Sequence, residues 1–162
     1  MANSVLSFPN PVNEVASRVV AGGVVVIAVV AIATQQPWLS AVLAYGFLAR
    51  VATGPTLSPL GQLATRIVAP RIAAQPRLVP GPPKRFAQAI GAVLTVAATV
   101  LYFGFGFTTP TYVLLGILVV AAALESFLGF CLGCQIFGRL MQMGIIPVEV
   151  CEACANIRSP AA

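Results

Sequence analysis

Residues 86–124 read FAQAIGAVLTVAATVLYFGFGFTTPTYVLLGILVVAAAL, and none of these side chains is charged. The run is longer than the roughly 20 apolar residues that one helix needs to cross a bilayer. Within it, the segment GFGFTTP at 104–110 carries the glycines and the proline that favour a turn. The stretch therefore predicts two membrane-spanning helices, at about 86–103 and 111–130, joined as a hairpin.

A second charge-free stretch runs from Val19 to Ala49 and predicts another hairpin. Gln35-Gln36-Pro37 supplies its turn, so its helices are expected at about 15–34 and 38–53. The composition agrees, because 59% of the residues are hydrophobic, 8% are charged and the mean hydropathy is +0.95. An average soluble domain has about 25% charged residues. The 162 residues thus predict a single all-α membrane domain with four transmembrane helices arranged as two hairpins.

The basic residues predict how this domain is oriented in the membrane. Neither hairpin turn carries a charge, whereas the loop at 54–85 between the hairpins holds five of the nine basic residues: Arg66, Arg71, Arg77, Lys84 and Arg85. Because lysine and arginine are enriched in cytoplasmic loops, this loop and both termini are expected on the cytoplasmic side of the inner membrane. The charge of +5 then reflects topology in a lipid bilayer, and no nucleic-acid partner is expected.

The loop between the hairpins divides into two parts. Residues 56–72 place leucine, isoleucine, valine and alanine near helical spacing, with Arg66 and Arg71 among them. This pattern predicts an interfacial helix that lies on the inner leaflet. Residues 75–84 contain four prolines and are expected to form an extended linker.

Two ionisable residues fall inside the predicted spans. Arg50 lies about 18 Å along its helix from Trp38, and Glu125 lies about 21 Å along its helix from Thr111. Ionisable groups at membrane depth usually face the bundle interior in pairs. The matching depths predict an intramembrane ion pair between Arg50 and Glu125. Two alternatives stay open, namely that Arg50 reaches the inner headgroups or that Glu125 belongs to a proton or substrate relay.

All four cysteines lie after the last predicted span, in a short cytoplasmic tail at 131–162. They form two C-x-x-C pairs, Cys131 with Cys134 and Cys151 with Cys154, and sixteen residues separate the pairs. That spacing suits a four-thiolate zinc site, an iron site or two dithiols. Because the cytoplasm disfavours structural disulfides, metal binding, transient redox chemistry and sulfur transfer remain as interpretations.

A redox function requires a reactive thiolate. Cys134 stands near a predicted helix start with Arg139 a turn further on, so we expect a lowered pKa there. Cys151 and Cys154 are close to two glutamates, whose charges disfavour thiolates. They are expected to act as a resolving pair or as metal ligands. The chain has no histidine and no aspartate, which excludes Ser-His-Asp triads and histidine-ligated haem.

Three segments carry a resemblance to a known family: FPNPVNE at 8–14, FCLGC at 130–134 and CEAC at 151–154. Together they resemble the small membrane family called domain of unknown function 4395, over nearly the whole chain. The resemblance implies a genomic neighbourhood with thioredoxin-like and rhodanese-type sulfurtransferase proteins, which favours thiol or sulfur handling. The residues carried over from the family are Asn10, Asn13, Glu14, Cys131, Cys134, Cys151 and Cys154.

The three polar residues of the first segment have two interpretations. Asn10, Asn13 and Glu14 are expected on the same side of the membrane as the cysteines, where they could support one cytoplasmic site. Alternatively, two prolines set a turn and Asn13 with Glu14 caps the first helix, with Arg18 one turn further on.

These observations predict a membrane-held thiol-redox or sulfur-transfer relay. Cys131 and Cys134 would react first with a thioredoxin-like or rhodanese-type partner, and Cys151 and Cys154 would receive; this relay requires no cofactor. The first alternative is a structural or docking protein whose four cysteines bind one zinc or iron ion. The second is a quinone-linked disulfide oxidoreductase, although such enzymes serve the oxidising face and the charges place these cysteines inside. Whether the protein is an enzyme or forms a homo-oligomer stays open.

Overall fold

The computed structural model describes residues 8–73, 75 and 77–151. In chain order its elements are β1 (Val12–Asn13), α1 (Glu14–Thr34), α2 (Trp38–Thr53), α3 (Pro59–Leu63), η1 (Ala64–Val68), α4 (Ala69–Ile72), β2 (Leu78–Val79), α5 (Gly81–Phe105), α6 (Thr108–Ala123), η2 (Leu124–Leu128), α7 (Leu132–Gln142) and η3 (Val148–Cys151). The predicted all-α class is confirmed.

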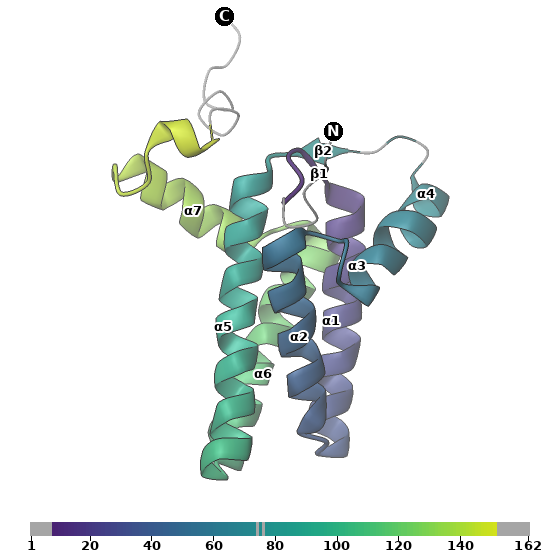
Figure 1. The fold of residues 1–162 in the computed structure, drawn as a ribbon, viewed down its shortest axis with the longest axis vertical. Helices are drawn as coiled ribbons and strands as arrows, with labels where there is room; N and C mark the ends of the chain where they lie inside the picture. The colour runs from purple at the N-terminus through teal and green to yellow at the C-terminus, as the bar shows by residue number, and fades with distance from the viewer. Residues whose placement is uncertain (1–7, 74, 76, 152–162) are drawn as a thin grey trace, which may run out of the picture.

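Four helices, α1, α2, α5 and α6, run side by side as a bundle (Figure 1). Three helical stretches are long and apolar enough to cross a membrane: Glu14–Thr34, Gly81–Phe105 and Thr108–Leu128. The remaining bundle helix, α2, is apolar but has only 16 residues. Small side chains fill the centre of the bundle, where Ala28, Ala31 and Ala98 are fully buried. Small residues let membrane helices approach closely.

The helix bounds follow the sequence closely, with one difference. The structure confirms α1 and α2 almost to the residue, but α5 begins at Gly81 rather than near Phe86. Pro82 and Pro83 lie in its first turn, where the missing backbone N–H of a proline has no helical partner to lose. The prolines therefore start a helix there, and the extended linker predicted over 75–84 is wrong for its second half.

The helical segment predicted over 56–72 forms as α3, η1 and α4, over 59–72. One of its faces packs on α1. Ala64 and Ala69 are buried in the same core cluster as α1, and a Cβ at Gly23 of α1 would meet Leu60 Cδ1 at 2.7 Å. Ile67 on the outer face remains exposed. The segment thus extends the bundle on one side.

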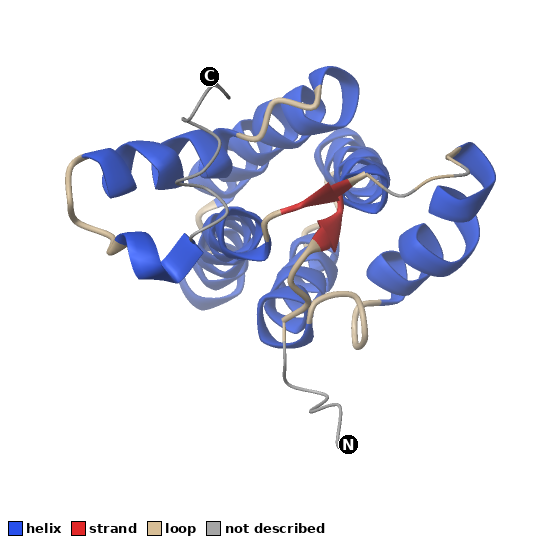
Figure 2. Ribbon diagram, turned by 90° about the horizontal axis from the view of Figure 1, so that it is seen from above, coloured by secondary structure: helices blue, strands red, loops and turns tan. Residues whose placement is uncertain are grey.

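A two-stranded ribbon crosses the end of the bundle at which α1 and α5 begin (Figure 2). β1 pairs antiparallel with β2, with Val12 opposite Val79, and the Glu14 backbone N–H donates to the Arg77 carbonyl at 2.8 Å. The Asn10 side-chain oxygen accepts the Gly81 backbone N–H at 3.0 Å. Pro80, at the N-cap of α5, makes no side-chain capping bond, so Asn10 supplies the cap from a distant part of the chain. We call this end of the bundle, which carries the ribbon, the head.

We expect replacement of Asn10 by alanine to lower the free energy of unfolding by about 1 kcal/mol, since it removes a helix cap. Equilibrium unfolding in detergent would measure the change. Asn10→Asp keeps the accepting oxygen and is the matched control. Equal stability of Asn10→Ala and the unmodified protein would show that the cap contributes nothing.

Two helical segments leave the head on opposite sides of the bundle. Residues 59–72 lie beside α1 on one side, and α7 packs against α5 on the other (Figure 2). The loops from α1 to α2 and from α5 to α6 lie at the far end (Figure 1). The head therefore gathers the ribbon, the start of α5 and the first cysteine pair.

Candidate functional site

The chain turns sharply between α6 and α7. Gly129 has φ +68°, a left-handed conformation that favours glycine, and its N–H donates to the Glu125 carbonyl at 3.1 Å. Arg18 of α1 donates to the carbonyls of Ser126 and Phe127 at 3.2 and 3.0 Å. These hydrogen bonds pair backbone carbonyls that would otherwise lack a partner at the end of the helix. The turn brings the next residues, including Cys131, back over the head.

Cys131 is the N-cap of α7, and this position joins it to Cys134. The Cys134 backbone N–H donates to Cys131 Sγ at 3.4 Å, and the Cys134 thiol donates to the same sulfur, with the two Sγ atoms 2.7 Å apart. Cys131 is buried, with 7% of its surface exposed. Both are free cysteines, and a disulfide could form between them with little movement.

The two thiols have opposite electrostatic environments. The hydrogen bond from Cys134 lowers the pKa of Cys131, and the positive charge of Lys84 lowers it further, against burial and the charge of Glu125. The same hydrogen bond raises the pKa of Cys134, and burial adds to this rise. Cys131 is therefore the more acidic of the two thiols, and Cys134 is its hydrogen-bond donor. The expectation of a lowered pKa at Cys134 is wrong, because the sulfur at the helix N-cap is that of Cys131.

The cation beside the cysteines is Lys84, in the first turn of α5. Its Nζ lies 2.6 Å from Glu125 Oε1, and only 9% and 14% of the two side chains are exposed. The structure therefore gives Glu125 a different partner from the predicted Arg50. The depth argument failed because it treated Lys84 as part of a linker, whereas α5 carries it into the bundle.

Arg50 is buried close by, with 5% of its surface exposed, but its direct contacts are to uncharged groups. Its Nε donates to Gln88 Oε1 at 2.8 Å and its Nη1 donates to Ser58 Oγ at 3.2 Å. The guanidinium also lies over the Phe47 ring, 4.5 Å from the centroid. Arg50 thus ties the end of α2 to α5 and to the loop before α3.

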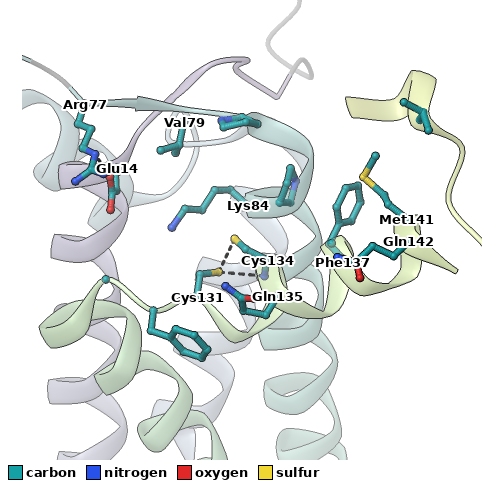
Figure 3. Close-up of a pocket in the computed structure, with 16 residues that line it drawn as sticks. Glu14, Arg77, Val79, Lys84, Cys131, Cys134, Gln135, Phe137, Met141 and Gln142 are labelled. Atoms are coloured by element: carbon teal, nitrogen blue, oxygen red, sulfur yellow. Dashed lines mark hydrogen bonds and ion pairs between the residues drawn. The ribbon is translucent and has the colours of Figure 1, made fainter. Parts of the chain in front are cut away.

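A pocket of about 660 Å³ opens at the head, over the first cysteine pair. In Figure 3, Lys84 extends toward Cys131 and Cys134, and the Phe137 and Met141 side chains line the α7 side. Glu14 and Arg77 form another part of the lining, with Arg77 Nε 2.9 Å from Glu14 Oε2. The pocket is apolar over much of its wall and brings two thiols and one buried cation together.

The other predicted site residues are placed as follows. Asn13 caps α1 by accepting the Val15 N–H at 3.0 Å, which confirms the cap. Glu14 pairs with Arg77 rather than with Arg18, yet it also lines the pocket of the cysteines. Asn10 caps α5, so both asparagines have structural roles. Arg139 is exposed on α7 and does not line the pocket.

The second cysteine pair is only partly described. Cys151 is buried at the end of η3 and is disulfide-bonded, whereas Cys154 lies outside the described residues. Across residues 8–73, 75 and 77–151 no group of three or more histidine, cysteine, aspartate or glutamate side chains could hold a metal ion. The predicted four-cysteine arrangement is therefore neither assembled nor tested within the part of the chain that the structure describes.

Residues 12–142 match the family described as "Domain of unknown function (DUF4395)". The chain belongs to this family. The matched region includes the four bundle helices, Lys84, Cys131 and Cys134, and it ends before Cys151. No curated protein matches the chain, and no solved structure matches it.

Sequence reasoning missed Lys84 as a member of the site. The sequence did contain a signal for the earlier start of α5. Pro82 and Pro83 directly precede Lys84, and prolines are common in the first turn of a helix. Extending α5 back to Gly81 places Lys84 one turn before Gln88, on the face that turns inward. Glu125 then has a cation, Lys84, at its own depth.

Proposed function

We propose that the protein is a membrane-held dithiol relay in which Cys131 is the nucleophile and Cys134 resolves the intermediate. The observation that carries the proposal is the pair itself, because one thiol donates a hydrogen bond to the other beside a buried lysine at the floor of a pocket. A lowered pKa is what distinguishes a reactive thiol from an inert buried one. The apolar wall suits a disulfide-bearing loop of a soluble partner.

The reaction is a thiol–disulfide exchange. The Cys131 thiolate attacks one sulfur of the partner's disulfide, which forms a mixed disulfide and releases one partner thiolate. Cys134 loses its proton and attacks Cys131 Sγ, which closes the Cys131–Cys134 disulfide and releases the second partner thiolate. Two electrons pass from this chain to the partner, whose disulfide becomes a dithiol; run in reverse, the same exchange reduces the Cys131–Cys134 disulfide with two electrons from a partner dithiol.

The second cysteine pair is proposed to receive electrons from the first. Cys131 and Cys134 are free thiols whereas Cys151 is disulfide-bonded, which fits an exchange in this direction. A Cys131 or Cys134 thiolate that attacks this disulfide is oxidised as the disulfide is reduced. The cysteines then work in sequence.

The proposed topology has four spans with the head in the cytoplasm. At 1.5 Å per residue α2 covers about 24 Å, less than the roughly 30 Å hydrocarbon core, but it runs beside α1 and α5 along the bundle (Figure 1). The head holds Arg77, Lys84 and Arg85, and the two uncharged turns lie at the far end. Lysine and arginine mark the cytoplasmic side.

Cys134→Ser is expected to accumulate a mixed disulfide with a thioredoxin-like partner, because the resolving thiol is missing. Cys131→Ser should form none, because the nucleophile is missing. Non-reducing gels and mass spectrometry of the trapped complex measure both. Equal amounts of trapped complex from the two variants would contradict the assignment of Cys131 as the nucleophile and Cys134 as the resolving thiol.

Two other outcomes of the same preparation would change the function. A persulfide on Cys131 after incubation with a rhodanese-type sulfurtransferase would assign sulfur transfer, in which the thiolate takes the outer sulfur and the partner thiolate leaves. About one equivalent of zinc or iron in protein purified without oxygen, lost when all four cysteines become serine, would favour the metal-bound alternative. We expect titratable thiols and no stoichiometric metal.

A further inference from the structure

A second cavity approaches Cys131 from the membrane side of the head. It is a cleft of about 180 Å³ between α5 and α6, beneath the first turns of α7. We call it the α5–α6 cleft. Its apolar lining comes from four helices: Phe47 of α2, Ile90 and Leu94 of α5, Ile117 and Leu118 of α6, and Leu132 and Ile136 of α7.

The cleft opens at a depth where water is absent in the proposed topology. Ile117 is about 14 Å along the helix from Thr108, close to the middle of the span Thr108–Leu128. Its side of α6 is outward, since Ile117 is 51% exposed and nearby Val120 is 60% exposed. An occupant of this cleft therefore enters from the acyl phase of the bilayer.

The inner end of the cleft is polar and reactive. Gln88, Glu125 and Cys131 line it. The Gln88 oxygen accepts the bond from Arg50, so its amide nitrogen is the end that can donate to a ligand. Cys131 lines both this cleft and the pocket at the head. In the proposed topology it therefore lies between a cavity that faces the cytoplasm and one that faces the lipid.

We propose that the α5–α6 cleft binds the ring of a quinone from the bilayer and that this quinone accepts the electrons of the Cys131–Cys134 dithiol. An uncharged ring suits the apolar walls, and a ring carbonyl can accept a hydrogen bond from Gln88. A cleft of about 180 Å³ is smaller than pockets that enclose a whole ligand, so the isoprenoid tail stays among the lipids. The inference rests on the dithiol relay proposed above, in the direction in which a partner dithiol reduces the Cys131–Cys134 disulfide, and names the membrane-side acceptor of those electrons.

The redox step balances with these groups alone. The dithiol gives up two electrons and two protons, and the sulfur–sulfur bond of the Cys131–Cys134 disulfide forms. The quinone takes up the two electrons and the two protons and becomes a quinol. Glu125 and Lys84, in contact with each other at the polar end, lie where protons must pass between the thiols and the ring. The expectation that cytoplasmic cysteines exclude quinone chemistry does not apply, because a quinone reaches this cleft from within the membrane.

The test uses the reduced full-length protein in nanodiscs without oxygen, with a decyl-tailed benzoquinone as the probe. Quinol absorbance and alkylation of Cys131 and Cys134 follow the reaction, and one quinol per disulfide is expected. Ile117→Trp fills the cleft and should slow the oxidation at least about tenfold, a change of about 1.4 kcal/mol in the barrier. Val120→Trp is the matched control, because it adds the same side chain to the same helix outside the cleft, and it should change the rate less than about twofold.

The outcomes separate this inference from the dithiol relay. Equal rates in the two tryptophan variants, or no oxidation by quinone while a soluble disulfide still oxidises the thiols, would overturn the inference and assign the cleft to an acyl chain. In that case the relay stands. Maleimide labelling of Cys131 through the head pocket checks that Ile117→Trp is folded. A slow quinone reaction in Ile117→Trp with unchanged labelling supports the cleft, even if no soluble partner is trapped.

Discussion

Replacement of Lys84 by methionine is expected to slow the alkylation of Cys131 by iodoacetamide at neutral pH. The ammonium group lowers the pKa of Cys131, so its loss raises that pKa and lowers the fraction of Cys131 that is thiolate. The thiolate is the reacting form. Alkylation rates measured over a range of pH would show the whole titration curve moved to higher pH.

Glu125→Gln provides the control for this prediction. The carboxylate raises the pKa of Cys131, so its removal should move the same curve to lower pH, while Lys84→Arg should leave it near its original place. Lys84→Met and Glu125→Gln both break the same ion pair. If they move the titration curve of Cys131 in opposite directions, they act on the thiol through their charges. If both variants slowed the alkylation equally, Lys84 would only support the fold.

Replacement of Gly133 by alanine is expected to separate α7 from α5. A Cβ at Gly133 would stand 2.5 Å from both Cα and Cβ of Ala87, and a backbone atom cannot give way as a side-chain end can. The helix must shift, which moves Cys131 and Cys134 away from Lys84. We therefore expect a loss of about 1–3 kcal/mol in stability and a change in the alkylation curve of Cys131.

Gly138→Ala is the matched control, because it makes the same change on the same helix. A Cβ at Gly138 meets nothing within 4 Å, so this variant should be unchanged or stabilised by about 0.5–1 kcal/mol. Unfolding in detergent and the alkylation curve report the two effects separately. Equal behaviour of the two glycine variants would show that α7 does not depend on its close contact with α5.

The sequence alone was sufficient to predict most of the helices that form the bundle. Charge-free runs and the turn signals at Gln35-Gln36-Pro37 and at 104–110 predicted α1, α2 and α6 within a few residues, because apolar length and chain-breaking residues are local properties. The C-x-x-C spacing also predicted the centre of the candidate site. A spacing of three residues at a helix start brings Cys131 and Cys134 together, whatever the rest of the fold.

Contacts between distant segments could not be predicted in the same way. The partner of Glu125 depends on where α5 begins, and two prolines are equally typical of a linker and of a first helical turn. Each strand of the β1–β2 ribbon has two residues, which is too short for a recognisable alternation of apolar and polar side chains, so the sequence did not predict it. The order of the thiol pKa values depends on which sulfur accepts the hydrogen bond, a detail that spacing alone does not contain.

The cap that Asn10 gives to α5 links positions 71 residues apart. Residues 10–14 are synthesised long before their partners at 77–81, so during translation the start of α1 has neither its paired strand nor the arginine that neutralises Glu14. Contacts of such long range slow folding, since the intervening chain must be ordered first. The β1–β2 ribbon and the cap of α5 can therefore form only after residues 77–81 have been synthesised. A truncated product that ends after α2 would therefore leave residues 10–14 without the strand, the arginine and the helix start that they contact in the full chain.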